Sequence, residues 1–143
     1  MRKYLTILFL MISILGFSKS LPIADTISYW KVYNGGQLLK EINGFSKDLK
    51  IILTKGKIRA IDTLNVKYFD DTPCDNCSSS LTIKTVDNKK IRTINNSKSN
   101  YDFDIKTTDL QMLAQKNNSS ILRFFYKEDV SNQAVLLFEI EIK

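Results

Sequence analysis

Apolar and polar residues alternate along most of the chain beyond its first twenty residues, a period that is typical of half-buried β-strands. The alternation is clearest in Tyr101–Lys106, where aromatic and aliphatic side chains take turns with charged ones. Turn-forming residues separate these stretches, and Asn34-Gly35-Gly36 is a strong hairpin signal. We expect strands at Thr26–Tyr33, Gln37–Ile42, Leu49–Leu53, Leu64–Asp70, Ser80–Val86, Ile91–Asn95, Tyr101–Lys106, Ile121–Lys127 and Ala134–Ile142.

The same alternation predicts which side chains enter the core. In the last strand, AVLLFEIEI, we expect Glu139 and Glu141 to face solvent. We also expect a neighbouring strand to cover this segment, because an open apolar edge recruits other chains. The predicted inward positions are Trp30, Val32, Leu49, Ile51, Leu53, Leu64, Val66, Tyr68, Leu81, Ile83, Leu136, Phe138, Ile140 and Ile142.

One segment breaks the strand pattern. Thr108 or Asp109 can cap a short helical turn, Leu110–Gln115, because such side chains accept hydrogen bonds from the first free backbone N–H groups. With a helical period, Leu110 and Leu113 share a face and would plug one end of a sandwich.

Many short strands, one short helical turn near residues 108–115 and no spacing for βαβ units favour an all-β fold, an antiparallel two-sheet β-sandwich. The pattern resembles the Greek-key sandwiches of immunoglobulin-like and fibronectin-like domains. The two cysteines, however, lie too close in sequence for the inter-sheet disulfide of antibody domains. An up-and-down β-barrel is the alternative, since hairpins explain most of the connections too.

The first twenty residues have the pattern of a secretory signal peptide. Arg2 and Lys3 precede the apolar run Tyr4–Phe17, and small residues follow at Ser18 and Ser20. The run is shorter than the about 20 residues that a membrane-spanning helix needs, so we expect cleavage and no membrane span afterwards. The predicted location is therefore secreted or periplasmic.

We expect residues 1–20 to be the signal peptide and residues 21–143 to form a single β-sandwich domain. Loss of Arg2, Lys3 and Lys19 with the leader would lower the formal net charge from +6 to +3. Two small basic clusters remain, which we interpret as solvated turn residues, with weak contact to an anionic glycan or lipid as the alternative. Without a continuous basic face, no nucleic acid partner is expected. The clusters are Lys55, Lys57 and Arg59, and Lys89, Lys90 and Arg92.

The chain contains no histidine, which removes the commonest general base and the commonest metal ligand. Nucleophilic systems built on Ser-His-Asp or Cys-His are excluded for the same reason. Two carboxylate pairs, Asp102 with Asp104 and Glu139 with Glu141, have the spacing of one strand face, and polar outer faces produce that pattern by default. We expect no enzyme activity, no cofactor and no metal site.

The only two cysteines, Cys74 and Cys77, form a Cys-Asp-Asn-Cys segment after Pro73. We predict a disulfide between them, because the expected compartment is oxidising. A catalytic dithiol and a soft-metal site with two thiolates are the alternatives. Nearby carboxylates would raise a thiol pKa, which disfavours the dithiol.

Candidate binding residues come from the first strand and from the cysteine loop. Tyr29 and Tyr33 should share one strand face, where their rings can stack on sugars or contact a protein. Packing between aromatic side chains on neighbouring strands is the alternative interpretation. Acidic residues of the loop could bind Ca²⁺ but are more simply solvated turn residues. The candidates are Tyr29, Tyr33, Phe69, Asp70, Asp71 and Asp75.

These observations predict a secreted or periplasmic, non-catalytic β-sandwich module for binding or adhesion, with a protein or a glycan as its partner. Two alternatives stay open. One is a thiol-redox or soft-metal-binding protein that uses Cys74 and Cys77. The other is a structural subunit of a cell-envelope assembly that offers an edge strand to its neighbours.

Overall fold

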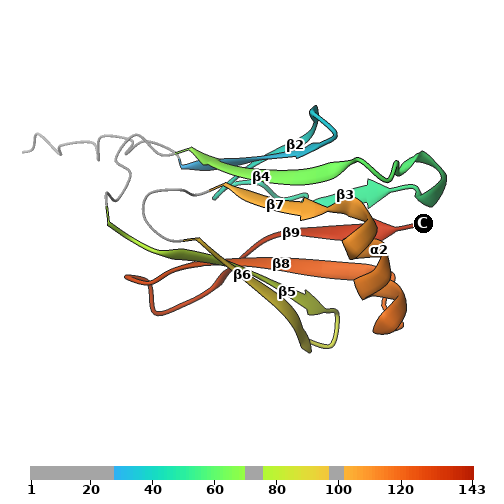
Figure 1. Cartoon of the computed structure of the whole chain (residues 1–143). Helices are drawn as coiled ribbons and strands as arrows, with labels where there is room; N and C mark the ends of the chain where they lie inside the picture. Colours follow the sequence, from blue (N-terminus) through green and yellow to red (C-terminus); the bar gives the residue numbers. More distant parts are fainter. Residues whose placement is uncertain (1–27, 70–75, 97–101) are drawn as a thin grey trace, which may run out of the picture.

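The computed structural model describes residues 28–69, 76–96 and 102–143. Within these ranges nine strands form two sheets. The sheets pack face to face (Figure 1). Sheet A has the strand order β2-β1-β4-β7, and sheet B has the order β3-β9-β8-β5-β6. The strands are β1 (Tyr29–Asn34), β2 (Gln37–Asn43), β3 (Lys50–Leu53), β4 (Thr63–Phe69), β5 (Ser79–Thr85), β6 (Lys90–Asn96), β7 (Phe103–Lys106), β8 (Ile121–Glu128) and β9 (Val135–Ile142). The predicted signal peptide lies outside the described residues.

The connections between the sheets follow the immunoglobulin-like order. β4 and β7 are neighbours in sheet A, like strands B and E, while β9-β8-β5-β6 in sheet B correspond to G, F, C and C′. β1 pairs with β4 and so takes the place of strand A. β2, which forms a hairpin with β1, is an additional strand at this edge of sheet A. The described strands form two open sheets, so the predicted sandwich is confirmed and the barrel alternative is wrong.

The predicted hairpin joins β1 to β2, and its turn has two central residues, Gly35 and Gly36, because Asn34 belongs to β1. Gly35 and Gly36 have φ angles of +54° and +85°, which are the left-handed values that a type I′ turn requires at both central positions. The Gly35 backbone N–H donates to the Thr63 carbonyl at 3.1 Å, and this bond fastens the turn to the start of β4.

The core lies between the sheets, where the alternating apolar positions meet. Phe124 and Phe138 stack there with centroids 4.5 Å apart. Near the start of β1, the Trp30 ring stacks on Tyr68 with centroids 4.8 Å apart and packs edge-on against Tyr126 at 5.6 Å. The largest fully buried side chains are Phe103, Phe124, Phe138, Leu64, Leu81, Ile83, Leu110, Leu122, Leu137, Ile140, Val32 and Val66.

One inward prediction, Leu136, is wrong. The β8–β9 register passes from Phe124 opposite Phe138 directly to Phe125 opposite Leu136, so Leu137 is an extra residue in a β-bulge. A bulge moves the following residues by one position and reverses the faces of the strand. Leu137 is therefore only 2% exposed, whereas Leu136 is half-buried.

The predicted helical turn is a longer helix, α2 (Thr107–Lys116), which lies at the end of the sandwich where the C-terminus is drawn (Figure 1). The predicted cap by Thr108 or Asp109 is wrong, because the helix begins earlier, and Lys106 at the N-cap makes no side-chain cap bond. Packing fixes the start instead, since the buried Thr107 Oγ1 donates to Asn34 Oδ1 at 2.8 Å.

The helix ends at Lys116, one residue beyond the predicted end at Gln115, and two asparagines follow it. Asn118 has a φ angle of +48°, and the Ser119 N–H donates to the Ala114 carbonyl at 3.0 Å, which is the Schellman arrangement. Leu110 is fully buried and Leu113 packs against the core, so the expected plug of the sandwich end is confirmed.

β9 is covered on both sides, as expected. β8 pairs with it in antiparallel fashion, and β3 pairs with it in parallel, with Ile51 opposite Ile140. The neighbouring edges of the two sheets, β2 and β3, are joined by a lysine: Lys40 Nζ lies 2.7 Å from Asp48 Oδ2 and 2.8 Å from the Lys50 carbonyl oxygen. An inward-pointing charge of this kind discourages pairing between edges of different molecules.

Candidate functional site

The aromatic residues predicted as binding candidates divide into two groups on the outer face of sheet A. Tyr29 and Phe69 are opposite each other on β1 and β4, and their rings stack at 4.9 Å with an interplanar angle of 8°. The Lys31 ammonium lies 5.2 Å and 5.3 Å from the two ring centroids. Because the rings cover each other's faces, this pair matches the alternative interpretation, packing between neighbouring strands.

Tyr33 instead borders a hollow. It lies four residues after Tyr29 on the same strand face, about 13 Å away along β1. The hollow has a volume of about 430 Å³ and crosses the outer face of sheet A from β1 over β4 to β7. We call it the sheet A trough, and it is lined by Tyr33, Gly36, Asn65, Lys67, Asp102 and Asp104.

The shape of the trough follows from the strand order. β1 and β7 flank β4, so their side chains stand about 10 Å apart, two strand spacings, across the residues of β4. Gly36 leaves the end near Tyr33 open, since it carries no side chain. Tyr33 therefore faces Asp104 across a floor formed by Asn65 and Lys67.

The polar groups of the trough hold one another in place. Asn65 Nδ2 donates to Asp104 Oδ1 at 2.6 Å, and Lys67 Nζ lies 3.8 Å from Asp102 Oδ2. A carboxylate accepts several hydrogen bonds, so Asp104 keeps acceptor capacity for a ligand. With two carboxylates and one ammonium, the trough suits uncharged hydroxyl groups better than anions.

The other predicted site residues lie mostly beyond the described ranges. Asp70, Asp71, Asp75 and Cys74 fall outside them, so the calcium and disulfide hypotheses on that loop stay predictions. Cys77 is described, is 5% exposed, and is not a free thiol. Among the described residues no group of Cys, Asp and Glu side chains is placed to hold a metal ion.

The Glu139 and Glu141 pair has a structural role on the outer face of sheet B. Glu139 accepts a hydrogen bond from Arg123 Nε at 2.7 Å, and Glu141 lies 2.6 Å from Lys50 Nζ. The hydrogen bond from Lys50 lowers the pKa of the Glu141 carboxyl, and the same bond raises the pKa of Lys50. Both carboxylates thus fasten β9 to its neighbours.

Two members of the basic clusters are also paired. Arg59 contacts Asp62 at 3.0 Å, and Arg92 contacts Asp109 at 3.3 Å. Lys55 and Lys57 lie in the 3-10 turn η1 (Lys55–Lys57), which joins β3 of sheet B to β4 of sheet A. Neither Lys55 nor Lys57 takes part in an ion pair among the described residues.

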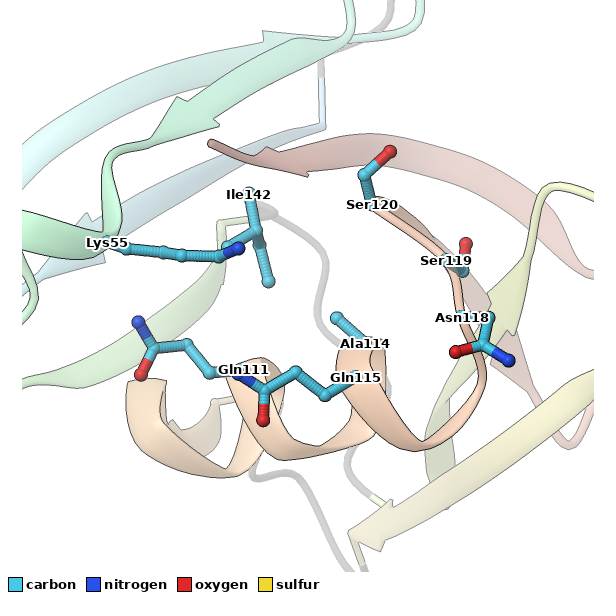
Figure 2. Close-up of a pocket in the computed structure, with 8 residues that line it drawn as sticks. All are labelled: Lys55, Gln111, Ala114, Gln115, Asn118, Ser119, Ser120 and Ile142. Carbon is cyan, nitrogen blue, oxygen red and sulfur yellow. The ribbon is translucent and has the colours of Figure 1, made fainter.

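Lys55 borders a second cavity, of about 300 Å³, at the α2 end of the sandwich. Figure 2 shows its side chain extending above α2, with Gln111 and Gln115 on the helix below it. Ala114 and Ile142, both nearly buried, give the cavity apolar surface. We call it the end pocket, and it is lined by Lys55, Gln111, Ala114, Gln115, Asn118, Ser119, Ser120 and Ile142.

Sequence patterns could not have found the end pocket, because three segments far apart in the sequence build it. The Lys55 N–H donates to the Lys143 carbonyl at 2.7 Å, and the Ile142 N–H donates to the Ser120 carbonyl at 2.9 Å. These bonds hold η1, the end of β9 and the exit of α2 together. The only signal in the sequence was the basic cluster that contains Lys55, which we interpreted as solvated turn residues.

In the part of the chain that the structure describes, no helix has the length and apolar character to cross a membrane. The sequence matches no protein-family model and no curated protein. Inference about function therefore depends on the geometry of these two cavities.

Proposed function

We propose that the protein is a secreted or periplasmic, non-catalytic binding module that holds a neutral glycan in the sheet A trough. The observation that carries the proposal is the position of Tyr33 opposite Asp104 across the trough, with the Asn65 amide in the floor between them. Sugars offer an apolar C–H face to an aromatic ring and hydroxyl groups to carboxylates and amides, so this combination matches their chemistry.

A glycan fits this surface better than a protein does. Protein interfaces have an apolar centre, whereas the lining of the trough is mainly polar and charged. The most exposed apolar side chains of the described chain, Phe45, Ile61 and Val130, lie in three different loops. Scattered apolar residues of this kind are ordinary surface and need no partner.

Binding to a panel of neutral oligosaccharides, measured by calorimetry, tests the proposal. Tyr33→Ala should weaken the affinity by about tenfold or more, which corresponds to about 1.4 kcal/mol. Tyr29→Ala is the matched control: it removes a tyrosine from the same strand and face, outside the trough, and should leave the affinity unchanged. Equal losses in both variants, or no binding to any neutral glycan, would contradict the proposal.

A further inference from the structure

The end pocket lies apart from the sheet A trough and differs from it in charge. Its lining contains one ammonium group, that of Lys55, and no acidic side chain. The remaining polar lining consists of amides and hydroxyls, from Gln111, Gln115, Asn118 and Ser120 among others. The trough, by contrast, contains two carboxylates and one ammonium. The two cavities therefore favour ligands of different charge.

We propose that the end pocket binds a single sugar unit that carries a carboxylate, a uronic acid. The Lys55 ammonium is placed to pair with the carboxylate, and no ion pair within the described chain occupies it. A hydrogen bond from an ammonium to a carboxylate is charge-assisted and roughly twice as strong as one between neutral groups.

The amide and hydroxyl groups of the lining favour a sugar as the part of the ligand that carries the carboxylate. The side-chain amides of Gln111 and Gln115 lie one helical turn apart on the same side of α2, and each offers both donors and acceptors. Sugar hydroxyls also donate and accept, so they can pair with either amide in any orientation. A simple carboxylate such as acetate would leave these groups without a partner.

The size and the floor of the pocket limit the ligand to one ring. About 300 Å³ is at the small end of the range for ligand sites. Ala114, with its single methyl group, keeps the space open above the helix, and Ile142 gives it an apolar wall. Apolar surface of this kind suits the C–H face of a sugar ring, while the backbone bonds between η1, β9 and the helix exit hold the walls in place before binding.

Titration of the purified protein with glucuronate and galacturonate, followed by amide chemical shifts in NMR spectra, tests the inference. We expect saturable shifts at Gln111, Gln115 and Ser120 with at least one of the two uronates. Lys55→Gln should weaken this binding by about tenfold. Lys57→Gln, which removes the same charge from the same turn but outside this pocket, should not change it.

Three further arms decide between ligands. Glucose should bind at least about tenfold more weakly than the uronate, and raising the salt from about 0.1 M to about 1 M should weaken uronate binding. Acetate that produced the same shifts with equal affinity would indicate an adventitious ion only and would overturn the inference. Equal binding of glucose, an unaffected Lys55→Gln variant, or no saturable shift would overturn it as well. Tyr33→Ala should leave uronate binding intact, so this inference and the proposed function can fail separately.

Discussion

The side chain of Asp62 occupies the space that a Cβ atom on Gly35 would need: such an atom would lie 2.8 Å from Asp62 Oδ1. The turn of the β1–β2 hairpin and the loop before β4 are therefore packed without room for a methyl group. Asp62 is itself fixed there, because its carboxylate accepts hydrogen bonds from the backbone N–H and the guanidinium of Arg59, each at 3.0 Å.

This contact predicts unequal effects of alanine at the two glycines of the turn. Both have positive φ angles, so alanine at either position should cost about 1–2 kcal/mol of backbone strain. Gly36→Ala should lose only this amount, since nothing lies within 4 Å of its added Cβ. Gly35→Ala should lose more, because Asp62 must also move. Denaturant unfolding of both variants measures the difference, and equal losses would contradict the contact.

The bulge in β9 supplies a second matched pair. Leu137→Ala should destabilise the protein by about 2–5 kcal/mol, because it leaves a cavity in the core. Leu136→Ala, on the half-buried face, should cost clearly less. The same unfolding experiment measures both changes. A larger loss at Leu136 would mean that the strand continues its alternation through this position without the bulge.

The bulge also shows which features of the fold can be predicted from the sequence and which cannot. Alternation is a local property, so it located every described strand and most inward positions, such as Leu81 and Ile83. A single extra residue in a strand leaves no mark in a run of apolar residues such as AVLLF, because each choice of face buries a leucine. The partner strand decides which leucine is buried, and pairing with β8 cannot be known from β9 alone.

The site was predictable to a similar extent. Tyr33 and Tyr29 were placed correctly on one strand face, because a period of two fixes the face. Their different surroundings depend on tertiary pairing, since Phe69 covers Tyr29 and β7 brings Asp104 to the side opposite Tyr33. The β6–β7 crossover that places β7 beside β4 has no local signal.

Asp62 gives the fold a defined response to acid. Hydrogen bonds from Arg59, the backbone N–H first, hold the pKa of the Asp62 carboxyl below its usual value. A carboxyl with a lowered pKa stabilises the folded state above its unfolded pKa, about 3.9, and loses this contribution as the pH falls through the folded value. Asp62→Asn should therefore lower the melting temperature at neutral pH, with the difference from the unmodified protein shrinking below about pH 4. Asp87→Asn, in an exposed turn, is the control. A difference that stays constant with pH would contradict this role.

Replacement of Lys40 should change both the pKa of Asp48 and the tendency of the protein to self-associate. The hydrogen bond from Lys40 lowers the pKa of the Asp48 carboxyl, so Lys40→Met should raise that pKa toward its usual value. NMR titration of the Asp48 carboxyl measures the change. The same variant removes the charge between the edges of β2 and β3, and it should self-associate more than the unmodified protein in sedimentation experiments. Lys47→Met, an exposed lysine in the preceding loop, should do neither.

A capping side chain at the start of α2 should stabilise the protein, because packing and not a cap fixes where this helix begins. Lys106 occupies the N-cap, where its side chain offers no acceptor to the free backbone N–H groups. Its positive charge also lies at the positive end of the helix dipole. Lys106→Asn should stabilise the protein by about 1 kcal/mol. Lys116→Asn removes the same charge from the last turn, where it is favourable, and should destabilise by about 0.3–1 kcal/mol. Opposite signs for these two charge-matched substitutions, measured by thermal unfolding, are the expected result. A loss at Lys106 would mean that its part in β7, where it pairs with Thr63, outweighs its position at the helix start.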